Sequence, residues 1–600
     1  PTHLLFFFFS LYAIAMVLPE LLVILAEWVL YRLLAKSCYR AARKLRGYGF
    51  QLKNLLSLSK TQSLHNNSQH HLHNHHQQNH PNQTLQDSLD PLFPSLTKYQ
   101  ELLLDKNRAC SVSSDHYRDT FFCDIDGVLL RQHSSKHFHT FFPYFMLVAF
   151  EGGSIIRAIL LLLSCSFLWT LQQETKLRVL SFITFSGLRV KDMDNVSRSV
   201  LPKFFLENLN IQVYDIWART EYSKVVFTSL PQVLVERFLR EHLNADDVIG
   251  TKLQEIKVMG RKFYTGLASG SGFVLKHKSA EDYFFDSKKK PALGIGSSSS
   301  PQDHIFISIC KEAYFWNEEE SMSKNNALPR ERYPKPLIFH DGRLAFLPTP
   351  LATLAMFIWL PIGFLLAVFR ISVGVFLPYH VANFLASMSG VRITFKTHNL
   401  NNGRPEKGNS GVLYVCNHRT LLDPVFLTTS LGKPLTAVTY SLSKFSEFIA
   451  PLKTVSLKRD RKKDGEAMQR LLSKGDLVVC PEGTTCREPY LLRFSPLFAE
   501  LTEDIVPVAV DARVSMFYGT TASGLKCLDP IFFLMNPRPV YCLEILKKLP
   551  KEMTCAGGKS SFEVANFIQG ELARVLGFEC TNLTRRDKYL VLAGNEGIVR

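Results

Sequence analysis

A histidine and an aspartate stand five residues apart in the stretch VLYVCNHRTLLDPVFL, which runs from Val412 to Leu427. His418 follows an apolar run that predicts a buried strand, and Asp423 lies just before a proline that shapes a loop. An imidazole that donates one ring N–H to a carboxylate is fixed in one tautomer, and its second nitrogen can take a proton from a hydroxyl. The alternative is a strand end and a capped helix start without chemistry, because such pairs also arise by chance.

Three more stretches with candidate chemistry follow this pair in order along the chain. A β-like run ends in a cluster of cations before an amphipathic helix, a strand leads into a glycine turn with an arginine beyond it, and DIVPVAV predicts another buried strand. Cations at strand ends and backbone N–H groups in a turn suit a phosphate monoester and the oxyanion of a thioester under attack. Each stretch alone has an ordinary structural explanation, whereas the ordered set favours an active site. The candidate residues are Lys458, Arg459, Arg461, Glu482, Gly483 and Arg487.

The stretches NHRTLLDP, VSLKRDR, PEGTTCREP and IVPVAV resemble the four blocks of the glycerolipid acyltransferases that carry an N-H-x-x-x-x-D motif. From FFCDIDGVLL to ECTNLTRRDKYLVLAGNEG, the chain resembles the land-plant membrane-bound glycerol-3-phosphate acyltransferases, and only the N-terminal insert lies outside the match. The resemblance implies an α/β acyltransferase domain that transfers an acyl group from acyl-CoA, or from acyl carrier protein, to a hydroxyl of glycerol 3-phosphate. The implied product is lysophosphatidic acid.

The resemblance also assigns roles to the residues of the first block. His418 is expected to be the general base, and Asp423 is expected to orient and charge-stabilise it. The hydroxyl oxygen then attacks the thioester carbonyl directly, so we expect neither a metal nor an acyl-enzyme, and no cofactor beyond the acyl donor.

The remaining blocks are expected to form the substrate site. Arg459 matches the arginine that holds the phosphate, and Arg487 is a further phosphate candidate. Glu482 and Gly483 match the pair that shapes the substrate site, and Pro507 is expected on the acyl side. Lys458 stands where many family members carry an acid, and its charge is expected to strengthen phosphate binding.

The N-terminal half contains FCDIDGVLL, which resembles the first motif of haloacid-dehalogenase-like phosphatases. That resemblance implies an aspartate nucleophile, an aspartate acid/base and Mg²⁺ between carboxylates and phosphate. The fourth motif requires an acid after GIG, but the chain has a serine there and its next acid lies further on. We therefore expect a degenerate phosphatase domain. We expect a requirement for Mg²⁺ only if this domain retains phosphatase activity. The residues of this site are Asp124, Asp126, Thr228, Lys276 or Lys278, Ser297 and Asp303.

Composition limits the classes of partner. The chain has 600 residues and a net charge of +17, which invites a nucleic-acid hypothesis. However, no basic-aromatic nucleic-acid module is present, and the basic clusters flank apolar segments. A membrane surface or a phosphorylated substrate explains that placement better. The twelve cysteines include no C-x-x-C pair and no metal spacing, which favours a reducing compartment.

The N-terminal region predicts membrane attachment and targeting. An apolar segment containing Met16, the first methionine, is followed by a dense cluster of Arg and Lys, and no acidic residue occurs from Trp28 to Gln86. This pattern is typical both of mitochondrial import segments and of the cytosolic flank of a signal anchor. We expect an integral, multi-pass protein of a mitochondrial membrane, with the endoplasmic reticulum as the alternative.

The predicted fold class is α/β throughout: a Rossmann-like haloacid-dehalogenase-like domain with a cap, then an α/β acyltransferase domain, with membrane helices. The stretch IIRAILLLLSCSFLW is either a cap helix or a membrane helix, because it is short for a span. The predicted boundaries are an anchor over 1–50, a disordered His/Asn/Gln-rich insert over 51–118, the phosphatase-like domain over 119–320, a linker over 321–345, a membrane helix or re-entrant hairpin over 346–385 and the acyltransferase domain over 386–590.

Several functions remain open at this stage. The leading hypothesis is acylation of glycerol 3-phosphate, the first step of glycerolipid synthesis. A lysolipid acyltransferase is the nearest alternative, because the first block does not distinguish acceptors. A bifunctional enzyme that releases monoacylglycerol, a lipid phosphatase with a regulatory second half, and a membrane scaffold are the others.

Overall fold

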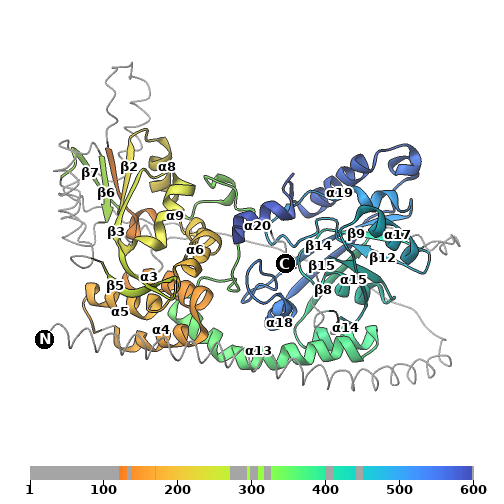
Figure 1. The fold of residues 1–600 in the computed structure, drawn as a ribbon, viewed down its shortest axis with the longest axis horizontal. Helices are drawn as coiled ribbons and strands as arrows, with labels where there is room; N and C mark the ends of the chain where they lie inside the picture. The colour runs from red at the N-terminus through yellow and green to blue at the C-terminus, as the bar shows by residue number, and fades with distance from the viewer. Residues whose placement is uncertain are drawn as a thin grey trace, which may run out of the picture.

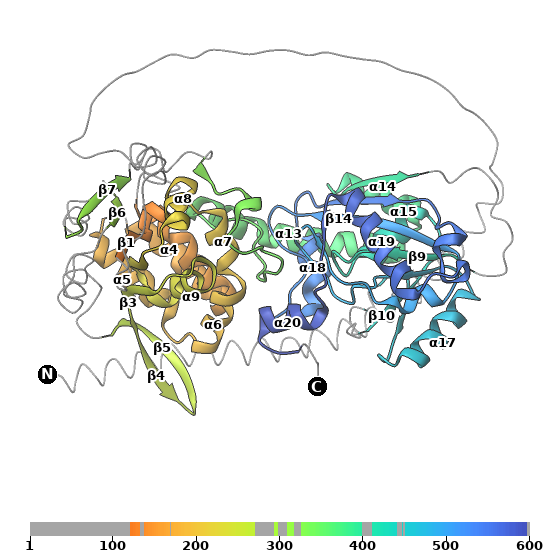
Figure 2. The ribbon, with the colours of Figure 1, turned by 90° about the horizontal axis from the view of Figure 1, so that it is seen from above.

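The computed structural model describes residues 120–131, 137–168, 170–269, 293–297, 309–316, 326–398, 411–440, 447 and 450–596. The predicted anchor and insert lie outside these residues. Two lobes stand side by side, one built by the N-terminal half and one by the C-terminal half, and a long helix runs beneath both (Figure 1). The view from above shows the same separation of the lobes (Figure 2).

The N-terminal lobe contains a five-stranded parallel sheet in the order β3-β2-β1-β6-β7. Its central strand β1 is almost entirely buried, as expected of a parallel strand that is covered on both faces. This strand order confirms the predicted Rossmann-like domain. The strands are β1 (Thr120–Asp124), β2 (Ser223–Pro231), β3 (Asp247–Thr251), β6 (Leu293–Ser297) and β7 (Glu312–Trp316).

Helices and one hairpin complete this lobe. The short apolar stretch forms α4, whose 14 residues are too few for a bilayer core, which needs about 20 residues. One face of α4 is buried at Leu161, and the opposite face exposes Leu163. The helices are α3 (His137–Leu147), α4 (Ile155–Leu168), α5 (Gln173–Phe185), α6 (Val190–Ser199), α7 (Leu201–Glu207), α8 (Ile211–Arg219) and α9 (Gln232–Leu243), and the hairpin is β4 (Leu253–Val258) with β5 (Arg261–Ala268).

The C-terminal lobe contains a seven-stranded sheet in the order β11-β10-β12-β9-β14-β15-β8. The first five strands of this order are parallel to one another, whereas β15 runs antiparallel to β14. The strands are β8 (Arg392–Thr397), β9 (Leu413–Cys416), β10 (Thr436–Thr439), β11 (Lys453–Ser456), β12 (Leu477–Val479), β14 (Ile505–Arg513) and β15 (Val540–Ile545). The helices around it are α15 (Asp423–Leu431), α17 (Arg461–Leu472), α18 (Asp529–Leu534), α19 (Ser561–Leu576) and α20 (Arg585–Ala593).

The long helix beneath the lobes is α13 (Pro350–Phe376), which has 27 residues and continues through Pro361. The structure therefore favours the single-helix alternative over the hairpin. In the part of the chain that the structure describes, α13 is the one helix long and apolar enough to cross a membrane, by length and composition. The predicted multi-helix membrane region is thus not seen there. The shorter α14 (Tyr379–Met388) follows and packs against α13.

Polar contacts fasten α13 to the C-terminal lobe. The buried Arg370 guanidinium donates to the carbonyl oxygens of Leu534, the last residue of α18, at 2.6 Å and of Asn536 just beyond it at 2.7 Å. Trp359 Nε1 donates to the Met535 carbonyl at 2.8 Å. Because carbonyls at a helix end need donors, these bonds satisfy α18 and fix α13 against the lobe at the same time.

Within the predicted linker over 321–345, residues 333–343 form no helix or strand, and this stretch packs between the lobes. Its Asp341 is buried, pairs with Arg487 at 3.4 Å and accepts from Ser523 Oγ at 2.8 Å. Its His340 contacts Glu488 at 2.6 Å. The segment therefore has a fixed position beside the C-terminal sheet.

Candidate active site

The candidate residues gather because their strands end at one edge of the C-terminal sheet. Strands β11, β10, β12 and β9 are neighbours and parallel, so their carboxyl ends lie together. Arg459 follows β11, Glu482 and Gly483 follow β12, and His418 follows β9. Ligands of open α/β sheets bind at this edge, and the ordered blocks of the sequence thus form one site.

His418 is oriented by Asp423 and by the end of its own strand. Its Nδ1 donates to Asp423 Oδ2 at 2.8 Å, which leaves Nε2 as the acceptor nitrogen. The His418 side chain is 16% exposed and lines a cavity, whereas Asp423 is fully buried. Asn417, which directly precedes His418, forms two hydrogen bonds with the backbone of Val510 on β14, both at 2.8 Å. These bonds fix the turn that follows β9.

The Asp423 carboxylate is held by a network that the sequence analysis missed. It begins α15 and accepts from the backbone N–H of Arg419 at 2.7 Å and of Thr420 at 3.0 Å. It also accepts from the hydroxyl of Tyr541, a fully buried residue on β15. Tyr541 stacks on Phe426 with ring centroids 4.1 Å apart. Several donors to one carboxylate hold it in a fixed position.

Glu482 holds the backbone of the catalytic turn in place. Its Oε1 accepts from the His418 N–H at 2.7 Å, and its Oε2 accepts from the Leu492 N–H at 3.1 Å. The carboxylate is buried, and burial raises the pKa of Glu482 to about 7. It does not line either cavity of the site, so its geometry is that of a support for His418.

The electrostatics around His418 favour its charged form. Burial lowers the pKa of His418, but Cys480 and Asp423 beside it raise the pKa by more. The pKa of His418 is therefore raised well above the usual imidazole value. The hydrogen bond with Cys416 and burial raise the pKa of the Cys480 thiol well above its usual value, so this thiol is neutral. We therefore assign the rise at His418 to the Asp423 carboxylate.

One cluster of three potential metal-ligating groups occurs in the described parts of the chain, formed by His418, Asp423 and Cys480 within 4.8 Å of one another. The hydrogen bond already occupies His418 Nδ1, and the Cys480 thiol is protonated, whereas a metal binds thiolate. The donor set therefore fits a hydrogen-bonded base better than a metal centre.

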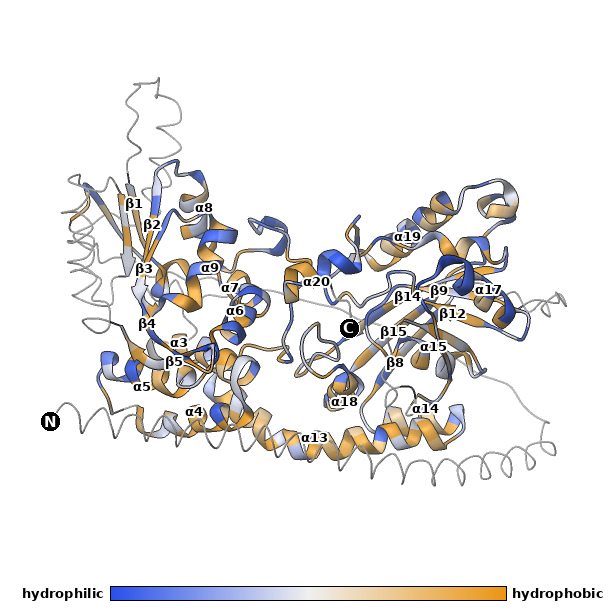
Figure 3. Ribbon diagram, in the orientation of Figure 1, coloured by the Kyte–Doolittle hydropathy of each residue, from blue (hydrophilic) through white to orange (hydrophobic). Residues whose placement is uncertain are grey.

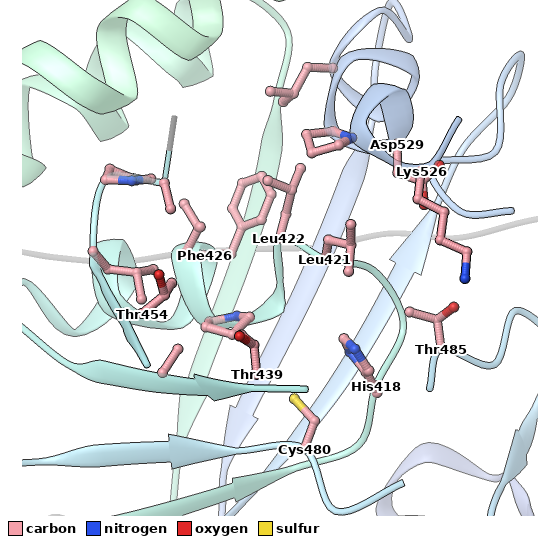
Figure 4. A pocket seen from close by; sticks show the side chains of 18 of the residues that line it. His418, Leu421, Leu422, Phe426, Thr439, Thr454, Cys480, Thr485, Lys526 and Asp529 are labelled. Atoms are coloured by element: carbon pink, nitrogen blue, oxygen red, sulfur yellow. The ribbon is translucent and has the colours of Figure 1, made fainter. Parts of the chain in front are cut away.

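His418 opens into a cavity of about 760 Å³ (Figure 4). One part of its wall is apolar and comes from α13, α14, α15, β10 and β11. The other part is polar and comes from the glycine turn and α20. The apolar wall includes Ile371, Ala382, Ala386, Leu422, Phe426, Val438 and Leu452, and the polar wall includes Gly483, Thr484, Thr485, Arg585 and Lys588.

A second hollow of about 370 Å³ adjoins the polar wall, because Tyr440, Gly483 and Arg585 line both spaces. Arg459 and Arg461 line this hollow as well. Gly483 has a backbone φ of +64°, which a residue with a side chain rarely adopts, so this shared wall favours a glycine.

Arg459 sits in a constrained loop. Its own φ is +63°, which is uncommon for a residue other than glycine. The buried carboxylate of Asp464 on α17 holds this conformation by accepting from the N–H groups of Lys458 at 2.8 Å and Arg459 at 2.9 Å. The loop directs Arg459 to the hollow, with its guanidinium 5.8 Å from the Tyr440 ring centroid.

Three other candidates lie outside both hollows. Lys458 is exposed and lines neither. Arg487 is buried, pairs with Asp341 and donates to Thr520 Oγ1 at 2.9 Å, so the geometry makes it a structural residue and does not support phosphate contact. Pro507 lies within β14 opposite Val415, in the sheet and away from the apolar wall.

The phosphatase-like residues lie in the other lobe, at the ends of β1, β2 and β6. Asp126 accepts from Thr228 Oγ1 at 2.8 Å and from the Ser229 N–H at 2.7 Å. Asp124 caps the turn by accepting from the Asp126 N–H at 2.9 Å. Ser297 is buried at the end of β6. Lys276, Lys278 and Asp303 lie outside the described residues.

Among these residues, the ones that the structure describes do not fit a magnesium site. Mg²⁺ prefers charged oxygen ligands, and β6 ends in the neutral Ser297 where the resemblance requires an acid. Both oxygens of the Asp126 carboxylate already accept hydrogen bonds from Thr228 and Ser229 of β2. Within the described residues, no cluster of three ligating groups surrounds Asp124.

Two functional candidates of the C-terminal helix were also missed by sequence reasoning. Arg585 and Lys588 line the cavity of His418, although they follow the fourth block at a distance. The signal that could have revealed them is the helical spacing of Arg585 and Lys588, three residues apart in TNLTRRDKYL. This segment lies within the part of the chain that the resemblance covers.

The comparisons with known proteins agree with these observations. Residues 120–316 match the family described as "Glycerol-3-phosphate acyltransferase RAM2-like, HAD-like domain", and residues 392–511 match the family described as "Acyltransferase". The chain is 46% identical over 491 residues to probable glycerol-3-phosphate acyltransferase 2 of Arabidopsis thaliana, covering 80% of this chain and 90% of the relative.

Two further relatives have similar identity. The chain is 44% identical to glycerol-3-phosphate acyltransferase RAM2 of Petunia hybrida, covering 79% of this chain and 97% of the relative. It is also 44% identical to probable glycerol-3-phosphate acyltransferase 3 of Arabidopsis thaliana, covering 82% of this chain and 92% of the relative. The sheet edge with its histidine, carboxylate and arginines and the extent of these matches lead to one conclusion: the chain belongs to the plant glycerol-3-phosphate acyltransferases.

Proposed function

We propose that this glycerol-3-phosphate acyltransferase uses His418 as the general base, takes its acyl group from acyl-CoA, works at a membrane surface and stops at lysophosphatidic acid. The observation that carries the proposal is His418 between a buried carboxylate and a cavity that is apolar on one side and cationic on the other. An acyl thioester and a phosphorylated alcohol require those two environments.

The proposed reaction is one direct transfer. His418 Nε2 takes the proton of a glycerol hydroxyl as its oxygen attacks the thioester carbonyl carbon, while Asp423 stabilises the imidazolium through Nδ1–H. A C–O bond forms, the C–S bond breaks, and the leaving thiolate takes the proton from His418. The products are the acylated glycerol phosphate and the free thiol.

The apolar wall supports a long acyl chain as the transferred group. Most of the side chains that α13, α14 and α15 contribute to the cavity lining are apolar. Burial of each CH₂ group of a chain contributes about 0.8 kcal/mol. The same cavity contains His418, so the thioester carbon of a chain bound there can reach the base.

The second hollow supports the phosphate of the acceptor. Arg459 from the β11–α17 loop and Arg461 at the start of α17 line it, and Gly483 lines both this hollow and the cavity of His418. Guanidinium groups bind phosphate oxygens in bidentate fashion, which orients the ligand as well as holding it. A three-carbon acceptor bound there presents a hydroxyl toward the base.

The phosphatase-like lobe supports lysophosphatidic acid as the final product. Its Ser297 replaces the expected acid, and the residues of this site that the structure describes do not fit Mg²⁺. Without that charge, removal of the phosphate lacks the electrostatic stabilisation that such sites provide. The lobe then acts as a structural partner of the C-terminal lobe.

Exposed apolar residues support contact with one membrane leaflet. On α13 they recur with helical spacing, and Figure 3 shows the apolar α4, α13 and α14 along the same side of the molecule. Scattered apolar residues are ordinary on a surface, but a continuous stripe of this size is not. The exposed residues are Leu351, Leu354, Ile358, Ile362, Leu365 and Phe369 on α13, Ile155, Ile159, Leu163 and Phe167 on α4, and Val381, Phe384 and Met388 on α14.

The position of α13 favours a helix that lies in the leaflet over one that crosses it. Both lobes stand on the same side of α13, which is about 40 Å long at 1.5 Å per residue. A crossing helix would draw the charged outer surfaces of both lobes into hydrocarbon, which is costly. An in-plane helix instead places the apolar wall of the cavity next to the lipids, where long-chain acyl donors reside.

Product analysis tests the proposed function. Purified protein receives radiolabelled glycerol 3-phosphate with either oleoyl-CoA or oleoyl-acyl carrier protein, and thin-layer chromatography separates the lipids. We expect labelled lysophosphatidic acid with oleoyl-CoA and no monoacylglycerol. Labelled monoacylglycerol that disappears in Asp124→Asn would overturn the assignment of the product, and transfer to lysolipids in preference to glycerol 3-phosphate would overturn the acceptor.

A further inference from the structure

Helix α20 (Arg585–Ala593) lies between the two lobes (Figure 1), and its Arg585 and Lys588 line the cavity of His418. A capping box formed by Thr584 and Asp587 fixes where it begins. Lys588, Tyr589 and Leu592 are buried, whereas Arg586 is exposed, so the inward face carries residues with helical spacing.

Lys588, one helical turn after Arg585, forms hydrogen bonds with the glycine turn of the site. The buried Lys588 ammonium donates to the carbonyl of Thr485 at 2.5 Å, to Thr485 Oγ1 at 3.2 Å and to Thr484 Oγ1 at 3.4 Å. On the other side, α20 packs against α6 of the N-terminal lobe. The position of Arg585 is therefore set by both lobes.

Arg585 faces the space that Arg459 faces. It lines the second hollow together with Arg459 and Arg461, and it also lines the cavity of His418. Burial and the nearby Arg459 charge lower the pKa of the Arg585 guanidinium. Like charges that converge on one hollow repel each other, and an anion bound between them relieves that repulsion.

We propose that Arg585 is a further phosphate-binding residue for glycerol 3-phosphate, contributed by the C-terminal helix and acting together with Arg459. The inference rests on the proposed function, because it assigns the second hollow to the acceptor phosphate. A phosphate monoester carries close to two negative charges at neutral pH, and arginines contributed by different elements match that charge and fix its orientation. The phosphate site is then complete only when α20 is docked.

The test compares neighbouring arginines of the same helix. Arg586 is the matched control, because its side chain is 67% exposed and pairs with Glu596 at 2.6 Å. The full-length Arg585→Ala, Arg585→Lys and Arg586→Ala proteins are assayed for KM toward glycerol 3-phosphate, KM toward oleoyl-CoA and the inhibition constant of inorganic phosphate. Loss of a charged hydrogen-bond donor from a partly buried site corresponds to roughly a 10- to 100-fold loss of binding.

We expect Arg585→Ala to raise both the KM for glycerol 3-phosphate and the inhibition constant of phosphate by that factor, with the KM for oleoyl-CoA unchanged. Arg585→Lys should recover part of the loss, and Arg586→Ala should match wild type. Equal phosphate binding in Arg585→Ala and Arg586→Ala would overturn the proposal, as would a rise in all constants of Arg585→Ala together. Titration of inorganic phosphate by calorimetry without an acyl donor tests Arg585 even if wild type fails to acylate glycerol 3-phosphate, so the two failures are distinguishable.

Discussion

The Nδ1 atom of His418 lies 2.8 Å from Oδ2 of Asp423, and the other oxygen of that carboxylate accepts from the hydroxyl of Tyr541. The imidazole is therefore the exposed end of a hydrogen-bonded chain that runs from a buried strand to the cavity. The chain fixes the tautomer of His418 and sets its basicity.

Asp423→Asn should remove most of the activity. Loss of the Asp423 charge leaves the buried imidazolium without a counter-charge. We therefore expect kcat to fall by about 10²- to 10⁴-fold. Because Asp423 raises the pKa of His418, the acid limb of the pH–kcat profile should move to lower pH in the variant. In wild type that limb should lie above the usual imidazole value of 6.5. The pH dependence of kcat checks both, and an unmoved limb would contradict the role of Asp423.

Tyr541→Phe should change the profile in the opposite direction. The variant removes a donor to Asp423 without changing the apolar ring that packs on Phe426. The carboxylate then attracts the proton of His418 more strongly, so the acid limb should rise and kcat near neutral pH should fall by about tenfold or less. The same pH series measures it. A shift to lower pH would show that the hydroxyl acts in some other way.

Glu482→Gln should alter how stability depends on pH. Burial raises the pKa of Glu482 from 4.5 to about 7, so the folded state holds this proton more tightly than the unfolded chain. The stability that this group contributes is present in full below pH 4.5 and is lost as the pH rises through 7, by about 3 kcal/mol at most. Thermal unfolding in detergent from pH 4.5 to 8 should show a smaller decline for the variant. Parallel declines would contradict the prediction.

Arg459→Ala and Lys458→Ala should differ although the residues are adjacent. Arg459 lines the second hollow, whereas Lys458 is exposed and lines neither space. We expect the KM for glycerol 3-phosphate to rise about 10- to 100-fold in the first variant and to change less than twofold in the second. Steady-state kinetics at saturating oleoyl-CoA measure this. Equal effects would restore the phosphate role that the sequence predicted for Lys458.

The proposed leaflet contact predicts which side of the protein lipid covers. Single cysteines replace Ile358, on the exposed stripe of α13, and Lys462, an exposed residue of α17 in the C-terminal lobe. In lipid vesicles, a membrane-impermeant maleimide should label Lys462→Cys readily and Ile358→Cys slowly, because lipid excludes the reagent. A detergent that disperses the bound lipid should abolish the difference in labelling between the two variants. Equal labelling in vesicles would contradict the contact.

Much of this architecture could be predicted from the sequence, because local patterns dominate it. The apolar strand before His418 and the aromatic strand before Asp124 both form as expected, and the spacing of His418 and Asp423 reflects one turn between β9 and α15. The ordered blocks meet because the strands that carry them are parallel neighbours.

The rest depended on contacts between distant segments. Tyr541 reaches Asp423 only because β15 packs beside β14, and Arg585 reaches the hollow only because α20 docks between the lobes. Arg487 has the positive charge that phosphate binding requires, but it forms an ion pair with the buried Asp341 of the predicted linker. No local pattern reveals such pairings.

Replacement of His418 by alanine tests the central claim most directly. Membranes that contain equal amounts of wild-type and His418→Ala protein receive labelled glycerol 3-phosphate and oleoyl-CoA, and the initial rate of lysophosphatidic acid formation is measured at saturating substrates. The structure predicts a loss of at least about 100-fold with binding of glycerol 3-phosphate retained. A variant that keeps its rate to within a few-fold would show that another group removes the proton.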